Sequence, residues 1–250
     1  MATLKVPLSA EMLDAALSHA EQEGLSHLNF LELIVGELAT RSRRRAVERR
    51  IRDAKFHEER NLENFDWTFN AAAIDRAQIE QLATGEFVRR GENLVIVGQS
   101  GVGKSHLLQA LGKRLCEIGY RIRYTTSAEL LQELRASLAD QSLRRCLRTW
   151  SRFDLVIIDE FGFDGIERNE CPEAANLLYK LIDARSGKRS TALGTNIDLD
   201  KWSDYLGDPP LVMALLDRVV YRVTALKICG KSYRAHRPKK PPSGPQSDPS

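Results

Sequence analysis

The sequence predicts an α/β protein in which a parallel sheet is flanked by helices and preceded by a small all-helical N-terminal domain. Beyond residue 90, short apolar runs alternate with helical patterns, which is the arrangement that builds a parallel sheet covered on both faces. A glycine-rich loop stands between the first of these runs and the helix that follows it.

The N-terminal region contains two predicted helices. Apolar residues on one helical face predict an amphipathic helix over residues 29–40, and a very basic helix over residues 43–54 is expected to follow. The residues of the first apolar face are Leu31, Ile34, Val35 and Leu38. Helical periodicity breaks over residues 61–67. We therefore expect a helical partner-binding or DNA-binding domain over residues 1–65 and a core domain over residues 66–234.

The core domain is expected to contain five strands. A helical pattern over residues 73–83 precedes the first strand, and a helix over residues 104–118 follows it, ending at Gly119, which suits a left-handed cap. The candidate strands are residues 94–97, 122–125, 155–158, 191–195 and 223–228. From Ala235 onward the chain is rich in proline, lysine and serine, so residues 235–250 are expected to be a disordered tail.

A phosphate-binding loop joins the first strand to its helix. Its residues are Gly98, Gln99, Ser100, Gly101, Val102, Gly103, Lys104 and Ser105. The glycines allow backbone N–H groups to turn toward phosphate oxygens, and the N-terminus of the helix adds partial positive charge. Lys104 is expected to reach the β and γ phosphates, and Ser105 to ligate Mg²⁺. The motif predicts ATP and Mg²⁺ as cofactors; His106, which extends the loop in the family resemblance described below, is expected to be a further nucleotide-binding residue.

Acidic and polar residues follow two of the later strands. Asp159 and Glu160 end the third strand, at the edge of the sheet where ligands bind in open α/β folds. Asp159 fits the role of a magnesium ligand, and Glu160 that of the group that accepts the proton of the attacking water. Asn196 follows the fourth strand and either orients that water or is an ordinary turn residue.

Composition and charge narrow the class of protein. Hydrophobic residues make up 42% and charged residues 28%, which excludes a largely disordered chain. No apolar run is long enough to span a bilayer, and no secretory signal is readable, so we expect a cytoplasmic protein without a membrane partner. The four cysteines and five histidines lack metal-ligand spacing. Basic residues cluster over residues 41–55 and 218–240, where they bind nucleic acid or form solvated helix faces.

Phosphoryl transfer is often accelerated by an arginine that a neighbouring subunit supplies. Arg218 is the first candidate, because it lies near the end of a predicted helix, and Arg222 and Arg234 are its competitors. The alternative for Arg218 is a surface arginine paired with Asp217.

Several segments resemble the IstB-like transposition helper ATPases, which belong to the DnaC-like branch of the AAA+ superfamily. They are residues 98–106, 159–162, 194–196, 215–218 and 230–234. Residues 54–56, residues 65–67 and the arginine-rich N-terminal helices also look like that family, so the resemblance covers roughly residues 10–236. Two departures are Ser105, where threonine is common, and Gly194-Thr195, where Thr-Ser is frequent.

The resemblance implies a P-loop AAA+ core in which ATP is bound between neighbouring subunits, with Asn196 as sensor 1 and Arg218 as the finger acting in trans. It also implies a homo-oligomeric ring or spiral on DNA. The helical stretch over residues 127–150 resembles the extra helices of initiator and helicase-loader ATPases. Its arginines either face DNA or form an exposed basic face; they are Arg144, Arg145 and Arg148.

These observations lead to one principal hypothesis and two alternatives. The principal hypothesis is an ATPase that binds double-stranded DNA without strong sequence preference and stimulates a cognate transposase. A DnaC-type replicative helicase loader would share the same core and differ in the partner that its N-terminal domain binds. A small-molecule kinase would use the same phosphate loop but need an acceptor pocket and no arginine from a neighbour.

Overall fold

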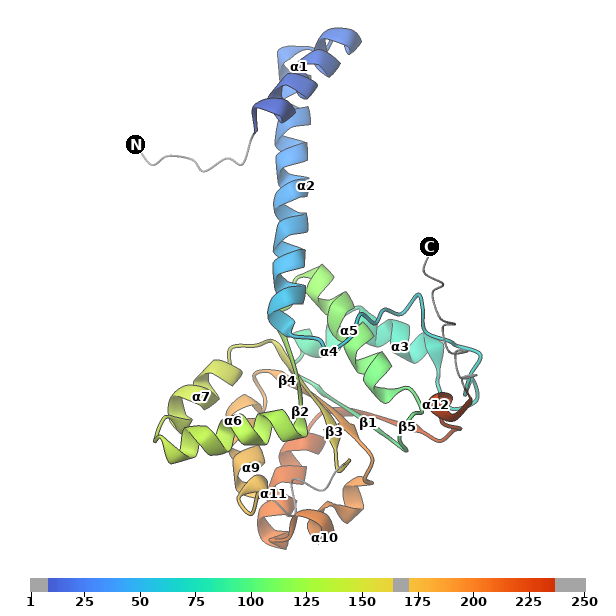
Figure 1. Ribbon diagram of the computed structural model, residues 1–250, viewed down its shortest axis with the longest axis vertical. Helices are drawn as coiled ribbons and strands as arrows, with labels where there is room; N and C mark the ends of the chain where they lie inside the picture. The colour runs from blue at the N-terminus through green and yellow to red at the C-terminus, as the bar shows by residue number, and fades with distance from the viewer. Residues whose placement is uncertain (1–8, 164–170, 237–250) are drawn as a thin grey trace, which may run out of the picture.

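A computed structural model describes residues 9–163 and 171–236 of the chain. Its centre is a sheet of five parallel strands in the order β2-β3-β4-β1-β5 (Figure 1). The strands are β1 (Asn93–Gly98), β2 (Ile122–Thr126), β3 (Leu155–Phe161), β4 (Ser190–Thr195) and β5 (Val223–Ile228). All five predicted strands are confirmed. Among the described residues, no helix combines the length and apolar character needed to cross a membrane.

Alternate residues of each inner strand pack into two separate apolar cores. In β1, Leu94 and Ile96 enter one core, whereas Val95 and Val97 enter the other. Because both faces of the strand are buried, it is continuously apolar instead of alternating. The edge strand β5 is only partly buried, since one side of it lacks a neighbouring strand.

Helices cover both faces of the sheet, as predicted (Figure 1). The helices on one face are α3 (Arg76–Ala83), α4 (Glu86–Arg89) and α5 (Lys104–Ile118). Those on the other are α6 (Ser127–Ala139), α7 (Leu143–Trp150), α9 (Ala174–Arg185), α10 (Trp202–Leu206) and α11 (Pro209–Val220). The predicted helical stretch over residues 127–150 is thus two helices, and the chain turns between them at Gln141, which has a φ of 61°.

The N-terminal region is a helical arm that rises from the core (Figure 1). It consists of α1 (Ala10–Glu23), which sequence patterns did not reveal, and α2 (His27–Ala54). The expectation of two helices over residues 29–40 and 43–54 is wrong, because α2 is one helix of 28 residues. No proline interrupts it, and the Thr40 hydroxyl donates to the Gly36 carbonyl 2.9 Å away, so polar residues at this point do not end the helix.

The base of the arm is attached to the core beside α5 and β2. Ala54 is fully buried, and the Arg50 guanidinium donates to the Cys116 carbonyl at 2.8 Å. After α2 the chain runs without helix over the same core, where Phe56, Leu62 and Phe65 pack. These three residues were expected to belong to the separate domain of residues 1–65, yet they lie against α5 and the sheet.

The described part of the chain ends with α12 (Tyr233–His236). Residues 235 and 236, which were expected to begin a disordered tail, are therefore helical. The remainder of that expected tail, residues 237–250, lies outside the described residues.

Candidate functional site

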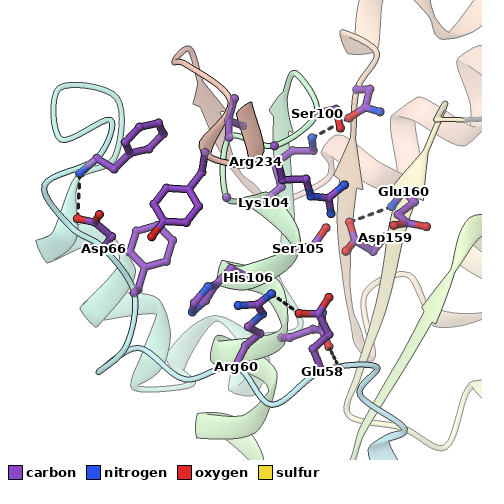
Figure 2. Close-up of a pocket in the computed structure, with 18 of the residues that line it drawn as sticks. Glu58, Arg60, Asp66, Ser100, Lys104, Ser105, His106, Asp159, Glu160 and Arg234 are labelled. Carbon is purple, nitrogen blue, oxygen red and sulfur yellow. Dashed lines mark hydrogen bonds and ion pairs between the residues drawn. The ribbon is translucent and has the colours of Figure 1, made fainter. Parts of the chain in front are cut away.

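A pocket of about 490 Å³ opens at the carboxyl ends of the central strands. This volume lies within the usual range for small-molecule sites. Figure 2 shows Lys104, Ser105, Asp159 and Glu160 lying together, with Asp66 on the opposite side of the pocket. The predicted site residues that line it are Ser100, Gly101, Val102, Gly103, Lys104, Ser105, His106, Asp159, Glu160 and Asn196.

The glycine-rich loop has the backbone shape that an anion site needs. Gly101 and Gly103 have φ values of 82° and 109°, which other residues rarely adopt. The first helical residue of α5 is Lys104, and its cap, Gly103, offers no side chain to the N–H groups of the first turn. Those N–H groups are directed toward the pocket, where phosphate oxygens would accept from them.

Lys104 and Asn196 are brought together inside the pocket although 92 residues separate them. The Lys104 ammonium donates to the carbonyls of Gly98 and Gln99 at 2.8 and 2.9 Å, and to Asn196 Oδ1 at 2.7 Å. Gly98 and Gln99 thus contribute through their carbonyl groups. Burial lowers the pKa of Lys104, and the charge of Asp159 opposes that effect.

Asp159 and Glu160 both line the pocket although consecutive strand residues normally point to opposite faces. The pairing register of β3 with β4 shifts between Ile158 and Phe161, and Glu160 has a φ of 61°. This irregularity turns the second carboxylate to the same side as the first. Spacing alone predicted two acids at the strand end, but only the bulge explains why both reach one cavity.

Asp159 is fully buried and held from two sides. Its Oδ1 accepts from the Glu160 N–H at 2.8 Å, and its Oδ2 accepts from the Tyr124 hydroxyl at 2.9 Å. A Cβ at position 194 would lie 2.3 Å from Asp159 Oδ1, so a larger residue there would displace this carboxylate. This contact gives a physical reason for the Gly194 departure from the family pattern.

The donor set suits a magnesium ion. The Ser105 hydroxyl and the Asp159 carboxylate both line the pocket, and both are hard oxygen ligands of the kind that Mg²⁺ prefers. Mg²⁺ usually keeps several waters and phosphate oxygens in its coordination shell, so two protein groups are sufficient.

The far side of the pocket is built by segments that sequence reasoning did not connect. Asn70 exchanges two hydrogen bonds with the backbone of Lys231, at 3.0 and 2.9 Å. The rings of Phe69 and Tyr233 meet edge to face at 5.0 Å, and the Tyr233 N–H donates to the Gly101 carbonyl at 2.8 Å. Residues 65–67 and 230–234 both belong to the predicted family resemblance, but neither segment indicates the contact between Asn70 and Lys231, which are 161 residues apart.

His106 lines the pocket but is tied to the segment that precedes the core. Its Nε2 lies 3.0 Å from the Asn61 carbonyl, and its ring meets that of Phe65 edge to face at 5.0 Å. Burial lowers the pKa of His106. These contacts make the imidazole part of the pocket wall rather than a phosphate ligand.

The three candidate arginines lie in different environments. Arg218 donates from Nε to Asp183 Oδ1 on α9 at 2.9 Å, so its ion-pair partner is Asp183 and not Asp217, which the alternative interpretation named. It does not line the pocket, whereas Arg234 does. The guanidinium of Arg222 lies over the Tyr221 ring, 5.4 Å from its centre.

The fold agrees with those of two solved proteins. Crystal structures of DnaI and of the DnaC helicase loader superpose with TM-scores of 0.55 and 0.53, at 20% and 21% identity. The matches cover 68% and 70% of this chain and 92% and 100% of those chains. Together with the glycine-rich loop, the sheet order and the pocket, the shared fold defines a P-loop protein of the α/β class.

The family model for IstB-like ATP-binding proteins matches residues 1–241, and the chain belongs to this family. One relative is the putative ATP-binding protein of insertion sequence IS21 from Pseudomonas aeruginosa, 31% identical over 96% of this chain and 89% of the relative. Another is a putative ATP-binding protein of an insertion sequence in Mycobacterium tuberculosis, 30% identical over 94% of this chain and 92% of the relative. The predicted family resemblance is thereby confirmed.

Proposed function

We propose that this protein is an ATP-hydrolysing helper of transposition, which assembles on double-stranded DNA and stimulates its cognate transposase. The observation that carries the proposal is the convergence of Lys104, Asn196, Asp159 and Glu160 in one pocket of a chain from the IstB-like family. The names of its relatives, which are insertion-sequence proteins, favour a transposase over a replicative helicase as the partner.

Each residue of the phosphate end has a distinct role in this proposal. The backbone of the glycine-rich loop and Lys104 bind the triphosphate, while Ser105 and Asp159 hold Mg²⁺, which neutralises charge on the phosphates when it is bound. Asn196 orients the attacking water through its amide nitrogen, since its oxygen accepts from Lys104. Glu160 accepts the proton of that water.

Arg218 is proposed to act on the nucleotide of a neighbouring subunit. It lies outside its own pocket, and its side chain is 43% exposed despite the ion pair with Asp183. Arg234 lines the pocket of its own subunit and lowers the pKa of Lys104, so it is better placed to contact phosphates in cis. A homo-oligomeric ring or spiral would give Arg218 the target that its own subunit lacks.

Arg218→Ala is expected to lose most ATP turnover, because an arginine supplied in trans contributes a factor of roughly 10³ to 10⁵. Mixing this variant with Lys104→Ala protein should restore part of the turnover, since the second variant keeps an intact Arg218. Steady-state ATPase assays over a range of mixing ratios measure the effect. Two inactive variants that stay inactive in every mixture would contradict a trans role.

The proposed DNA interface includes the arm and α7. Exposed arginines on α2 lie in the half of the helix nearer the core, and they are Arg41, Arg43, Arg44, Arg45, Arg49 and Arg52. On α7, the apolar residues Leu147 and Trp150 pack inward, which leaves Arg144, Arg145 and Arg148 exposed. Guanidinium groups on both surfaces suit phosphate contacts without sequence readout.

Replacing Arg43, Arg45 and Arg49 by glutamine is expected to weaken ATP-dependent DNA binding equally on unrelated duplex sequences. Each lost phosphate contact reduces the slope of log affinity against log salt by about 0.9, so the triple variant should lose about 3 units of slope. The slope is measured for wild type and variant by fluorescence anisotropy of a labelled duplex between 50 and 200 mM salt.

The matched control replaces Arg76, Arg89 and Arg90, exposed arginines that pair with Glu80 or Glu86 away from the arm. This control should keep the wild-type slope. An unchanged slope in the arm variant would exclude the arm as the interface. Wild-type protein that binds no DNA with ATP at low salt would refute the proposed function, and capture of a replicative helicase by the full chain would favour a loader.

A further inference from the structure

The buried carboxylate of Asp159 has a partner that no motif contains. Tyr124 lies on β2, directly opposite Ile157 on β3, and its side chain is on the same face of the sheet as that of Asp159. Its hydroxyl donates to Asp159 Oδ2 at 2.9 Å. Tyr124 is itself only 3% exposed, so water does not compete for this bond.

The surroundings leave Asp159 little freedom. Glu160 N–H binds its other oxygen, and the side-chain-free Gly194 is the close neighbour on that side. The carboxylate is therefore held in one orientation by a backbone donor and a side-chain donor.

The ring of Tyr124 is in turn held by the segment that leaves the arm. His57 meets it edge to face at 5.0 Å, and Phe56 packs against it at 6.1 Å. Both residues follow Lys55, the left-handed cap that ends α2. His57 also lies 3.4 Å from Glu129, whose carboxylate caps the helix that begins directly after β2.

We infer that Tyr124 is a positioning residue for the magnesium-binding carboxylate, and that the base of the N-terminal arm supports it through His57. This inference rests on the proposed function, since it assigns Asp159 to Mg²⁺. Tyr124 does not line the pocket itself; it acts by orienting Asp159, as partners of ligating carboxylates do in metal sites.

Tyr124→Phe removes the hydroxyl and keeps the ring against Phe56 and His57. Nucleotide affinity is measured by calorimetry with ATP in excess Mg²⁺ and with ATP in EDTA. The ratio of the two affinities is expected to fall about 10- to 100-fold relative to wild type, while the affinity in EDTA is unchanged. Loss of affinity in both conditions would indicate a general structural effect and overturn the inference. A ratio equal to that of the wild type would also overturn it.

Tyr120→Phe is the matched control, because Tyr120 also donates its hydroxyl, at 3.1 Å to the Gly85 carbonyl, but lies outside the pocket. It should keep the wild-type ratio. His57→Ala changes a half-exposed side chain and tests the support from the arm. The ratio of the affinities in Mg²⁺ and in EDTA is expected to fall about 2- to 10-fold, from the usual strength of an aromatic contact. An unchanged ratio would show that the arm does not support Tyr124.

The same titrations distinguish failure of this inference from failure of the proposed function. If wild-type protein binds no ATP in either condition, the nucleotide site itself is refuted. If wild-type protein shows a strong Mg²⁺ dependence that Tyr124→Phe retains, the nucleotide site stands and the role of Tyr124 is refuted.

Discussion

Lys104→Ala is expected to abolish nucleotide binding at ordinary ATP concentrations. The variant removes a buried ammonium group and leaves the carbonyls of Gly98 and Gln99, together with Asn196 Oδ1, without their donor. Truncating one member of a buried charged pair costs about 2–5 kcal/mol of binding free energy, which is roughly a 30- to 5,000-fold loss of affinity. Calorimetric titration with Mg-ATP measures this loss.

The control for this variant is Lys113→Ala on the same helix, at a position that does not line the pocket. It should bind Mg-ATP as the wild type does. A thermal unfolding curve for each variant separates loss of the site from loss of the fold. Normal ATP binding by folded Lys104→Ala protein would contradict the assignment of the glycine-rich loop as the phosphate site.

Glu160→Gln is expected to bind ATP with near wild-type affinity and to hydrolyse it about 10² to 10⁴ times more slowly, the usual contribution of a general base. Glutamine keeps the size of the side chain but does not accept a proton from water. Single-turnover assays report the chemical step directly. Glu117→Gln, which changes an exposed carboxylate paired with Arg114, should leave turnover unchanged.

Glu160→Gln also tests whether release from DNA depends on ATP hydrolysis or on ATP binding alone. If hydrolysis releases the protein from DNA, Glu160→Gln protein should remain bound after ATP addition while wild-type protein dissociates. Anisotropy of a labelled duplex over time measures this difference. Equal turnover by wild type and variant would exclude Glu160 as the base.

The strained backbone at Glu160 is consistent with a carboxylate that is held in place for a function. A non-glycine residue at a φ of 61° costs about 1–3 kcal/mol, and such residues concentrate at functional sites. Here the strain has a visible result, because it brings Glu160 into the cavity that Asp159 already lines.

Several elements were predictable because their signals are local. The helix over residues 104–118 was predicted with the bounds that α5 has, since its apolar face, its glycine start and its glycine cap are contiguous. The helical arm was predicted less well. The expected break between residues 40 and 43 is absent, and α1 was missed although Ser9 and Gly24 cap its ends.

The sequence by itself determined the phosphate loop, the five strands and the family, because each depends on neighbouring residues whose types and order are sufficient. Only the tertiary structure decided which distant groups meet. Tyr124 binds Asp159, Phe69 meets Tyr233 and Arg218 pairs with Asp183 across 35, 164 and 35 residues of chain, respectively. Such contacts depend on strand order and helix packing, which involve the whole chain, whereas a motif describes only a few consecutive residues.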